Sequence, residues 1–63
     1  MFPELTDDEI RIVNTLQHTN DLQANIISVK CGFPISTVAS TLFSLELKGI
    51  VRLYAGGVYH LMG

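Results

Sequence analysis

Residues 42–59 read LFSLELKGIVRLYAGGVY and carry the strongest structural signal in the chain. Gly49 follows a run of helix-forming residues, and a glycine just past a helix supplies the left-handed backbone that closes its last turn. Residues 50–54 and 58–61 are rich in β-branched and aromatic side chains, which predicts two strands. The Gly56-Gly57 pair between them supplies the positive φ angles that a tight turn requires. This stretch therefore predicts a helix that stops at Gly49 and a β hairpin after it.

A two-residue turn at Gly56-Gly57 would place Tyr54 opposite Tyr59 in the hairpin. Because side chains alternate between the two faces of a strand, both tyrosines would then share one face. A cross-strand aromatic pair of this kind contributes about 0.2–1 kcal/mol. The other face would carry Val51, Leu53 and Val58. Both faces hold apolar groups, so the pattern leaves open which of them is buried.

The first helix is predicted at residues 7–17. Thr6 and Glu9 have the spacing of a capping box, in which each side chain accepts a hydrogen bond from the other residue's backbone N–H. Three consecutive acids, Asp7, Asp8 and Glu9, could instead hold a metal ion, but their position at the positive end of the helix dipole favours capping. The core stripe of this helix is expected to comprise Ile12, Val13 and Leu16.

Two further helices are predicted before Gly49. The second covers residues 26–31 with Asn25 as its N-cap, and the third covers residues 37–48 with Ser36 as its N-cap. At about 100° per residue, one face of the third helix is apolar and comprises Ile35, Val38, Leu42 and Leu45. The opposite face carries Ser36, Thr37, Ser40, Thr41 and Ser44. Ahead of these helices, Leu22 is expected to anchor a very short strand that pairs with the hairpin.

The order of these elements predicts an α+β fold, the winged helix-turn-helix, with three helices, a short strand and a two-stranded β wing. A short helix, a glycine-containing turn and a longer helix form the helix-turn-helix, and the longer helix would be the recognition helix. With 63 residues, the chain is expected to form one domain over residues 1–63. This fold usually contacts nucleic acid or another protein and seldom catalyses a reaction.

Charge argues against strong DNA binding. The chain has four Lys and Arg residues against six Asp and Glu residues, a net charge of −2. Duplex binding draws much of its affinity from cations that neutralise phosphates, and four scattered cations supply little. Cys31 is the only cysteine, which excludes an internal disulfide and favours a cytoplasmic location. No apolar run approaches the ~20 residues of a membrane span, so no membrane partner is expected.

The hydroxyl-rich face of the third helix is the expected DNA-contact surface. Hydroxyl groups donate to phosphates or base edges, and a helix N-terminus adds positive potential. A lysine at the helix end and an arginine on the wing, with His60 nearby, would add weak, salt-sensitive contact. The predicted nucleic-acid-binding residues are Ser36, Thr37, Ser40, Thr41, Lys48 and Arg52. Simple solvation of this face is the alternative.

Phe43 and Leu47 are predicted to contact a partner protein. They lie four residues apart on the third helix, about 100° and 140° from the centre of its apolar face. We expect them to form an exposed apolar ridge that docks on other domains of the same protein, on another protein or on a second copy in a homodimer. The alternative is that the hairpin or the first helix covers them.

The sequence shows no arrangement typical of catalysis. No Ser/His/acid set and no glycine-rich phosphate loop is evident, so an enzyme is not expected. His18, Cys31 and His60 lack the spacing of a zinc site, and no metal or other cofactor is expected. Cys31 is expected to be a small buried apolar group.

From Leu5 to Leu61 the chain resembles the small C-terminal winged-helix domain of DNA-processing protein A, the DprA/Smf family. The matching features are Leu5 with the acidic start Asp7-Asp8-Glu9, the Ile12-Val13 and Leu16 stripe, the turn Gly32-Phe33-Pro34 and residues 42–59. Within residues 42–59, the Leu-Glu-Leu run followed by a Gly-Gly wing is the feature most specific to this family. Family members often place basic residues around the Gly-Gly turn, where this chain has Ala55, Val58 and His60.

The resemblance implies that the chain is a C-terminal fragment of a larger protein. In that family a Rossmann-like central domain, absent from these residues, binds single-stranded DNA and helps load recombinase during natural transformation. The chain would then be an accessory winged-helix module of a protein linked to DNA uptake, with weak DNA contact of its own. The alternative is a protein-interaction or self-association module that acts through Phe43 and Leu47. A stand-alone transcription regulator fits the acidic composition least.

Overall fold

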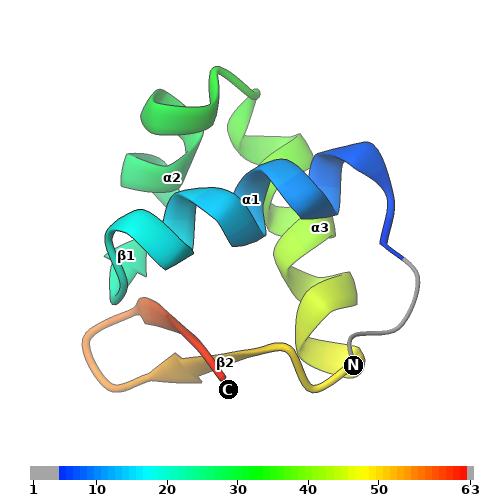
Figure 1. The fold of residues 1–63 in the computed structure, drawn as a ribbon. Helices are drawn as coiled ribbons and strands as arrows, with labels where there is room; N and C mark the ends of the chain where they lie inside the picture. Colours follow the sequence, from blue (N-terminus) through cyan, green and yellow to red (C-terminus); the bar gives the residue numbers. More distant parts are fainter. Residues whose placement is uncertain (1–4, 63) are drawn as a thin grey trace.

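The computed structural model describes residues 5–62, which fold into three helices and a small antiparallel sheet (Figure 1). The strand order is β1-β3-β2, so the last strand of the sequence lies in the centre of the sheet. The predicted α+β winged helix is confirmed. Residues 1–4 and 63, the ends of the single domain expected over residues 1–63, lie outside the described part. The elements are α1 (Asp7–His18), β1 (Leu22–Gln23), α2 (Ala24–Cys31), α3 (Ile35–Leu47), β2 (Val51–Tyr54) and β3 (Val58–Leu61).

The N-terminus of α1 carries the predicted capping box. Thr6 Oγ1 accepts a hydrogen bond from the Glu9 backbone N–H at 3.2 Å, and Glu9 Oε1 accepts one from the Thr6 N–H at 2.8 Å. These bonds satisfy donors that the start of a helix leaves without intrahelical acceptors. The helix begins at Asp7 as predicted and ends one residue later than predicted, at His18.

The predicted N-cap of α2 is wrong. The helix begins at Ala24 with Gln23 at the N-cap position, so Asn25 lies inside its first turn. The sheet fixes this start, because Gln23 is still paired with Val58 of β3 and the chain enters the helix at the next residue. Gly32 ends α2 as predicted, with a φ of 74°.

The predicted N-cap of α3 is also wrong, because the helix begins two residues earlier than expected. Pro34 is the N-cap, and its carbonyl accepts a hydrogen bond from the Val38 N–H at 3.1 Å. Ser36 therefore lies inside the first helical turn. Ile35, predicted in the core, is 52% exposed because it is the first helical residue and lies at the edge of the apolar face.

The end of α3 confirms the role predicted for Gly49. Lys48 is the C-cap rather than the last helical residue, and Gly49 has a φ of 77°. The Gly49 N–H donates to the Glu46 carbonyl and the Ile50 N–H donates to the Leu45 carbonyl, both at 3.0 Å. This pair of bonds is a Schellman motif, and it supplies N–H donors to carbonyls that have no donor within the last helical turn.

The hairpin forms at the predicted place but in a different register. Tyr54 pairs with Val58, and Leu53 pairs with Tyr59. The loop therefore has three residues, Ala55-Gly56-Gly57, instead of the predicted two. A shift of one residue moves every side chain of one strand to the other face relative to its partner. Tyr54 and Tyr59 thus lie on opposite faces of the sheet, and the predicted tyrosine pair does not form.

The corrected register pairs Tyr54 with a different ring. Tyr54 stacks on His60 with 5.0 Å between ring centroids and 17° between ring planes. Tyr59 points toward the core instead, and it lies opposite Leu22 of β1. The short strand predicted at Leu22 is therefore confirmed.

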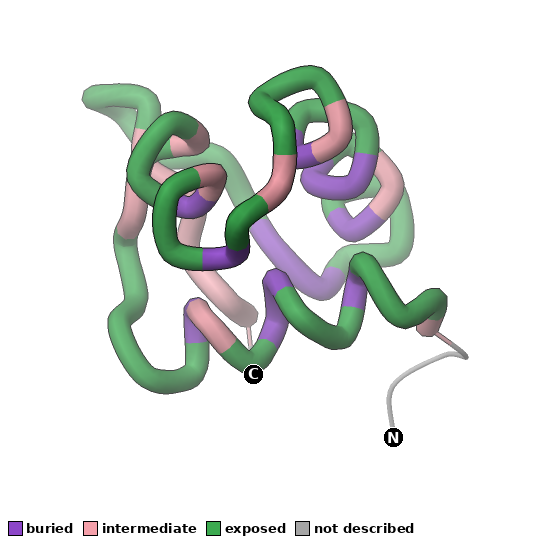
Figure 2. The backbone as a smooth tube through the Cα atoms, turned by 90° about the horizontal axis from the view of Figure 1, so that it is seen from above, coloured by how far each residue is buried: buried purple, intermediate pink, exposed green. Residues whose placement is uncertain are grey.

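The core lies where the three helices meet the sheet, and the buried positions in Figure 2 face this interior. All three residues predicted for the α1 stripe are buried, and so is Cys31, as expected. Thr41, predicted on the exposed face of α3, is buried as well. The apolar core comprises Ile12, Val13, Leu16, Ile27, Cys31, Val38, Leu42, Leu45, Ile50 and Val51.

Within residues 5–62, no single helix is long and apolar enough to cross a membrane. Only α2 and α3 together reach that length and composition, as a pair bent by 111°.

Candidate nucleic-acid interface

The four hydroxyl residues predicted to contact DNA differ in their accessibility. Ser36 and Ser40 are exposed on the N-terminal half of α3, and Thr37 is half-buried. Thr41 is only 8% exposed, and its Oγ1 donates a hydrogen bond to the Thr37 carbonyl at 2.7 Å. Of these four residues, only Ser36 and Ser40 are therefore exposed on α3.

Lys48, predicted to contact phosphate, forms an ion pair inside the domain. Its Nζ lies 2.8 Å from Oε1 and 2.9 Å from Oε2 of Glu9, whose side chain is 3% exposed. Glu9 Oε2 also accepts a hydrogen bond from Ser44 Oγ at 2.7 Å. The Glu9 carboxylate thus joins the start of α1 to the end of α3, a role that the capping pattern did not reveal.

The hydrogen bond from Lys48 and the bond from the Thr6 backbone N–H lower the pKa of Glu9 from 4.5 to about 2, against the opposing effect of burial. The bond from Ser44 acts in the same direction. Glu9 is therefore a carboxylate at neutral pH, and it holds the Lys48 ammonium close to the protein.

Arg52 lies on the exposed face of the wing. It pairs with His60 across the hairpin, and alternation places both side chains on the face that also carries Tyr54. His60 Nδ1 lies 2.7 Å from Asp21 Oδ1, so the His60 imidazole is in hydrogen-bond contact with a carboxylate. The wing therefore presents one guanidinium beside a histidine that is already hydrogen-bonded to an acid.

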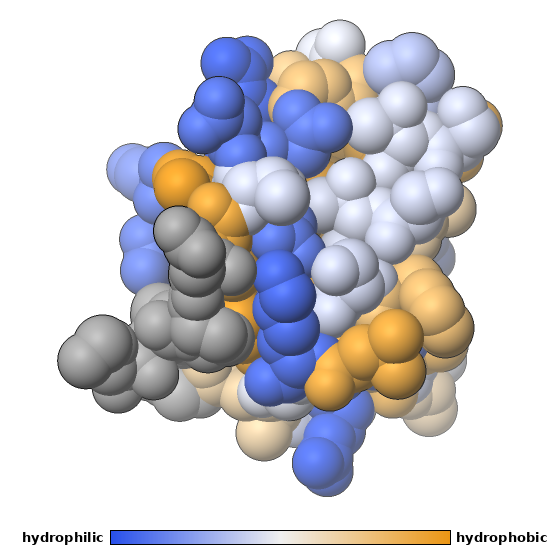
Figure 3. All heavy atoms as spheres, turned by 90° about the vertical axis from the view of Figure 1, so that its right-hand side faces the viewer, coloured by the Kyte–Doolittle hydropathy of each residue, from blue (hydrophilic) through white to orange (hydrophobic). Residues whose placement is uncertain are grey.

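Phe43 and Leu47 are exposed, as predicted. Their exposed fractions are 62% and 74%, so neither the hairpin nor α1 covers them. Ile35 and Ala39 are exposed on the same i, i+4 row. We name these four residues, Ile35, Ala39, Phe43 and Leu47, the α3 ridge. Figure 3 shows a pale, weakly polar area beside a separate apolar area on the side of the molecule where α3 lies.

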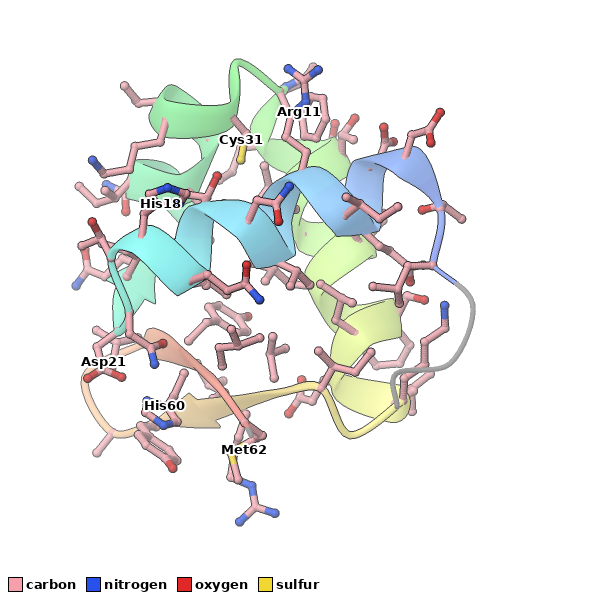
Figure 4. All side chains as sticks on the ribbon, viewed as in Figure 1. Arg11, His18, Asp21, Cys31, His60 and Met62 are labelled. Carbon is pink, nitrogen blue, oxygen red and sulfur yellow. The ribbon has the colours of Figure 1, made fainter. Side chains whose placement is uncertain are left out.

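Sequence reasoning missed a groove between α1 and α2. The groove has a volume of about 760 Å³ and is open to solvent. Arg11, Asn14 and His18 line it from α1, and Lys30 lines it from α2. Figure 4 shows Arg11 and His18 on the side of α1 nearest α2. The sequence did show polar residues at i, i+3 and i+7 on α1, namely Arg11, Asn14 and His18, which could have indicated one wall of the groove. It did not show that Lys30 lies opposite them, because that depends on how α2 packs against α1.

Among residues 5–62, no three His, Cys, Asp or Glu side chains are placed to hold a metal ion. The three acids at the start of α1 are used differently: Glu9 is buried in its ion pair, while Asp7 and Asp8 are exposed in the first helical turn.

The profile of the DprA winged helix domain matches residues 3–57 of the 63-residue chain. The chain belongs to this family. The matched range runs from before the α1 capping box through α3 and β2 to the Gly56-Gly57 turn. The resemblance found in the sequence is thereby confirmed for the DprA winged helix domain.

A solved structure of the Zalpha domain of ORF112 from Cyprinid Herpesvirus3, which describes the binding mode of that domain to Z-DNA, has the same fold. The superposition covers 95% of this chain and 100% of that chain, with a TM-score of 0.84 and 23% sequence identity. No curated protein matches the chain significantly. The family match and the shared fold together identify a winged-helix module of the DprA family.

Proposed function

We propose that this DprA winged helix domain is an accessory module of a DNA-processing protein of DNA uptake and natural transformation, and that it makes weak contact with DNA. The observation that carries the proposal is the family match over residues 3–57, which spans the helix-turn-helix and the first strand and turn of the wing. The shared fold with a domain that binds Z-DNA supports DNA as the partner.

The proposed contact uses the accessible polar groups of α3 and the wing. Ser36 and Ser40 lie near the positive N-terminal end of α3, where hydroxyls and backbone N–H groups favour phosphate. Arg52 adds one guanidinium from the wing. α3 contains no Arg, Lys, Asn or Gln, the residues that form bidentate bonds with base edges. The contact is therefore to the backbone, insensitive to sequence and weak.

A fluorescence anisotropy titration with labelled oligonucleotides tests this proposal. At roughly 50 mM salt we expect measurable binding that weakens steeply by roughly 200 mM, because phosphate contacts release counterions. Arg52→Gln should reduce the slope of log K against log salt by about one, and Arg52→Lys, which keeps the charge, should retain it. Absence of binding at the lower salt concentration would refute DNA contact by this domain.

The α3 ridge supports a second function, protein interaction. Monomeric soluble proteins rarely expose a large contiguous apolar patch unless it binds a partner. The exposed apolar residues of the α3 ridge lie on the recognition helix, where a protein that reads base edges would place polar and basic groups. Phe43 and Leu47 are the most exposed large apolar residues of this helix.

Phe43→Ser and Leu47→Ser separate this function from DNA contact. Sedimentation velocity of the chain over a concentration series should show self-association that both variants lose, or docking to the remaining domains of the parent protein that both variants lose. Val29→Ser is the matched control, because Val29 is 82% exposed on α2 and lies outside the ridge. An unmodified chain that stays monomeric and docks to no parent domain would contradict the interaction function.

A further inference from the structure

We infer that the α1–α2 groove binds the phosphate backbone of DNA. This inference rests on the proposed function that the domain contacts DNA, and it gives that contact a second location, away from α3 and the wing. The ligand group is the phosphodiester, and it comes from either single-stranded or duplex DNA.

The distribution of cations over the domain favours the groove. The chain has four Lys and Arg residues, and two of them, Arg11 and Lys30, line the groove. Lys48 is held by Glu9, and Arg52 stands alone on the wing. The groove therefore gathers half of the Lys and Arg residues of a chain whose net charge is −2.

Acidic groups are largely excluded from the groove. Of the carboxylates in residues 5–62, Asp7 alone lines it. The other four lie outside its lining: Glu9 faces Lys48, Asp21 faces His60, and Asp8 and Glu46 are exposed elsewhere. Two cations against one carboxylate give the groove a positive local charge, which attracts a polyanion although the whole domain is acidic.

The Arg11 side chain is held in place before any ligand arrives. Its guanidinium lies 5.5 Å from the ring centroid of Phe33, a cation–π contact. A cation–π contact does not use up the N–H groups of the guanidinium, so they remain able to donate to phosphate oxygens. Because the side chain is already partly ordered, less conformational entropy is lost when it binds.

The polar groups of the groove form a row rather than a single point. Arg11, Asn14 and His18 follow one another along one face of α1, and the first and last are separated by about 10.5 Å of helix rise. His18 Nδ1 donates to the Asn14 carbonyl at 2.8 Å, which holds the imidazole along the helix. Lys30 faces this row from α2. Arg11, Asn14 and Lys30 supply several separate N–H donors to the groove, and such a spread of donors suits a chain of phosphates better than an isolated anion.

The test measures salt dependence of DNA binding by the full 63-residue chain. Arg11→Gln and Lys30→Gln should each lower the slope of log K against log salt by about 0.7 for a single strand or about 0.9 for a duplex, and the double variant should lower it by about twice as much. Arg11→Lys and Lys30→Arg keep the charges and should retain the slope. Val29→Ser, next to Lys30 but outside the groove lining, is the matched control.

Amide chemical shifts of the unmodified chain give an independent readout. Addition of a labelled single strand or duplex should shift the resonances of Arg11, Asn14, His18 and Lys30. Lys30→Gln keeps the test valid if Arg11→Gln impairs folding, because the Lys30 side chain is exposed and takes no part in the Phe33 contact. The strand form that produces the shifts identifies the source of the phosphates.

Two outcomes separate this inference from the proposed function. If DNA binds but the slope responds to Arg52→Gln and not to the Arg11 and Lys30 variants, the groove is not the site and DNA contact through the wing stands. If the unmodified chain binds neither DNA form at roughly 50 mM salt, both the groove and the proposed DNA contact are wrong.

Discussion

Glu9 has two structural roles, helix capping and an ion pair with Lys48, and the sequence pattern indicated only the first. The Thr6-x-x-Glu9 pattern correctly predicted a capping box, since both of its hydrogen bonds form. The same carboxylate also accepts bonds from Ser44 and Lys48, which lie 35 and 39 residues away. Local spacing predicts the first set because it lies within one helical turn. The second set depends on how α3 crosses α1, and no local pattern encodes that.

The depressed pKa of Glu9 predicts a pH-dependent stability. Its pKa is about 2 in the folded chain and 4.5 in the unfolded chain, so the unfolded state binds the proton more tightly. The contribution of Glu9 is therefore complete above pH 4.5 and is lost as the pH falls toward 2. Urea unfolding followed by circular dichroism should show this loss, and Glu9→Gln should flatten it while lowering stability at pH 7. An identical pH profile in the variant would refute the assignment.

Removal of the side-chain ammonium should lower the free energy of unfolding at Lys48 but hardly change it at Lys30. Lys48→Met keeps an apolar side chain of similar length but leaves the buried Glu9 carboxylate without its counter-ion, at a cost of about 1–3 kcal/mol in the free energy of unfolding. Lys30→Met, on the exposed surface of α2, should change it by less than about 0.5 kcal/mol. Chemical denaturation at pH 7 measures both, and equal effects would show that the ion pair contributes no stability.

At the scale of the elements, the sequence predicted the type of every helix and strand but not every junction. Both wrong N-caps precede helices whose first residue is fixed by a neighbour, namely by the β1–β3 pairing for α2 and by Pro34 for α3. The prediction of the hairpin register was wrong because Ala55 belongs to the loop rather than to β2. An alanine gives no local signal that distinguishes a loop position from a strand position. Gly49 was predictable because the closing turn of a helix requires a positive φ.

Gly49 therefore provides a test of the helix end. Its φ is 77°, and a Cβ built there meets nothing within 4 Å. A substitution therefore destabilises the chain only through backbone strain and not through a steric clash. Gly49→Ala should lower the free energy of unfolding by about 1–2 kcal/mol. Gly49→Asn should lower it by less, because asparagine tolerates left-handed angles better. Thermal and urea denaturation compare the two, and equal losses would contradict the strain explanation.

At the scale of the whole molecule, the surfaces of the domain differ in character. The α3 ridge is apolar, the α1–α2 groove is cationic, and the wing carries one arginine. Phe43 and Leu47 of the ridge were predictable because they lie four residues apart on one helix, whereas Ile35 was predicted in the core. The groove was not predictable, because Arg11 and Lys30 lie 19 positions apart and meet only when α2 packs on α1.

A pair of leucines on α3 tests the division between core and surface. Leu42 is fully buried and Leu47 is 74% exposed. Leu42→Ala should cost about 2–5 kcal/mol, which is a large part of the stability of a domain this small. Leu47→Ala should change the free energy of unfolding by less than about 0.5 kcal/mol. Circular dichroism during urea unfolding gives both values, and a comparable loss at Leu47 would show that the ridge packs against the domain.

The position of β3 between β1 and β2 affects how the chain acquires its structure on the ribosome. Neither β1 nor β2 pairs with the other, and both depend on β3 for their ladder hydrogen bonds. During synthesis, β1 and β2 therefore stay without their ladder partner until β3, residues 58–61, has left the exit tunnel. All three helices precede β3 in the chain, so the complete sheet forms only after the helices have been synthesised.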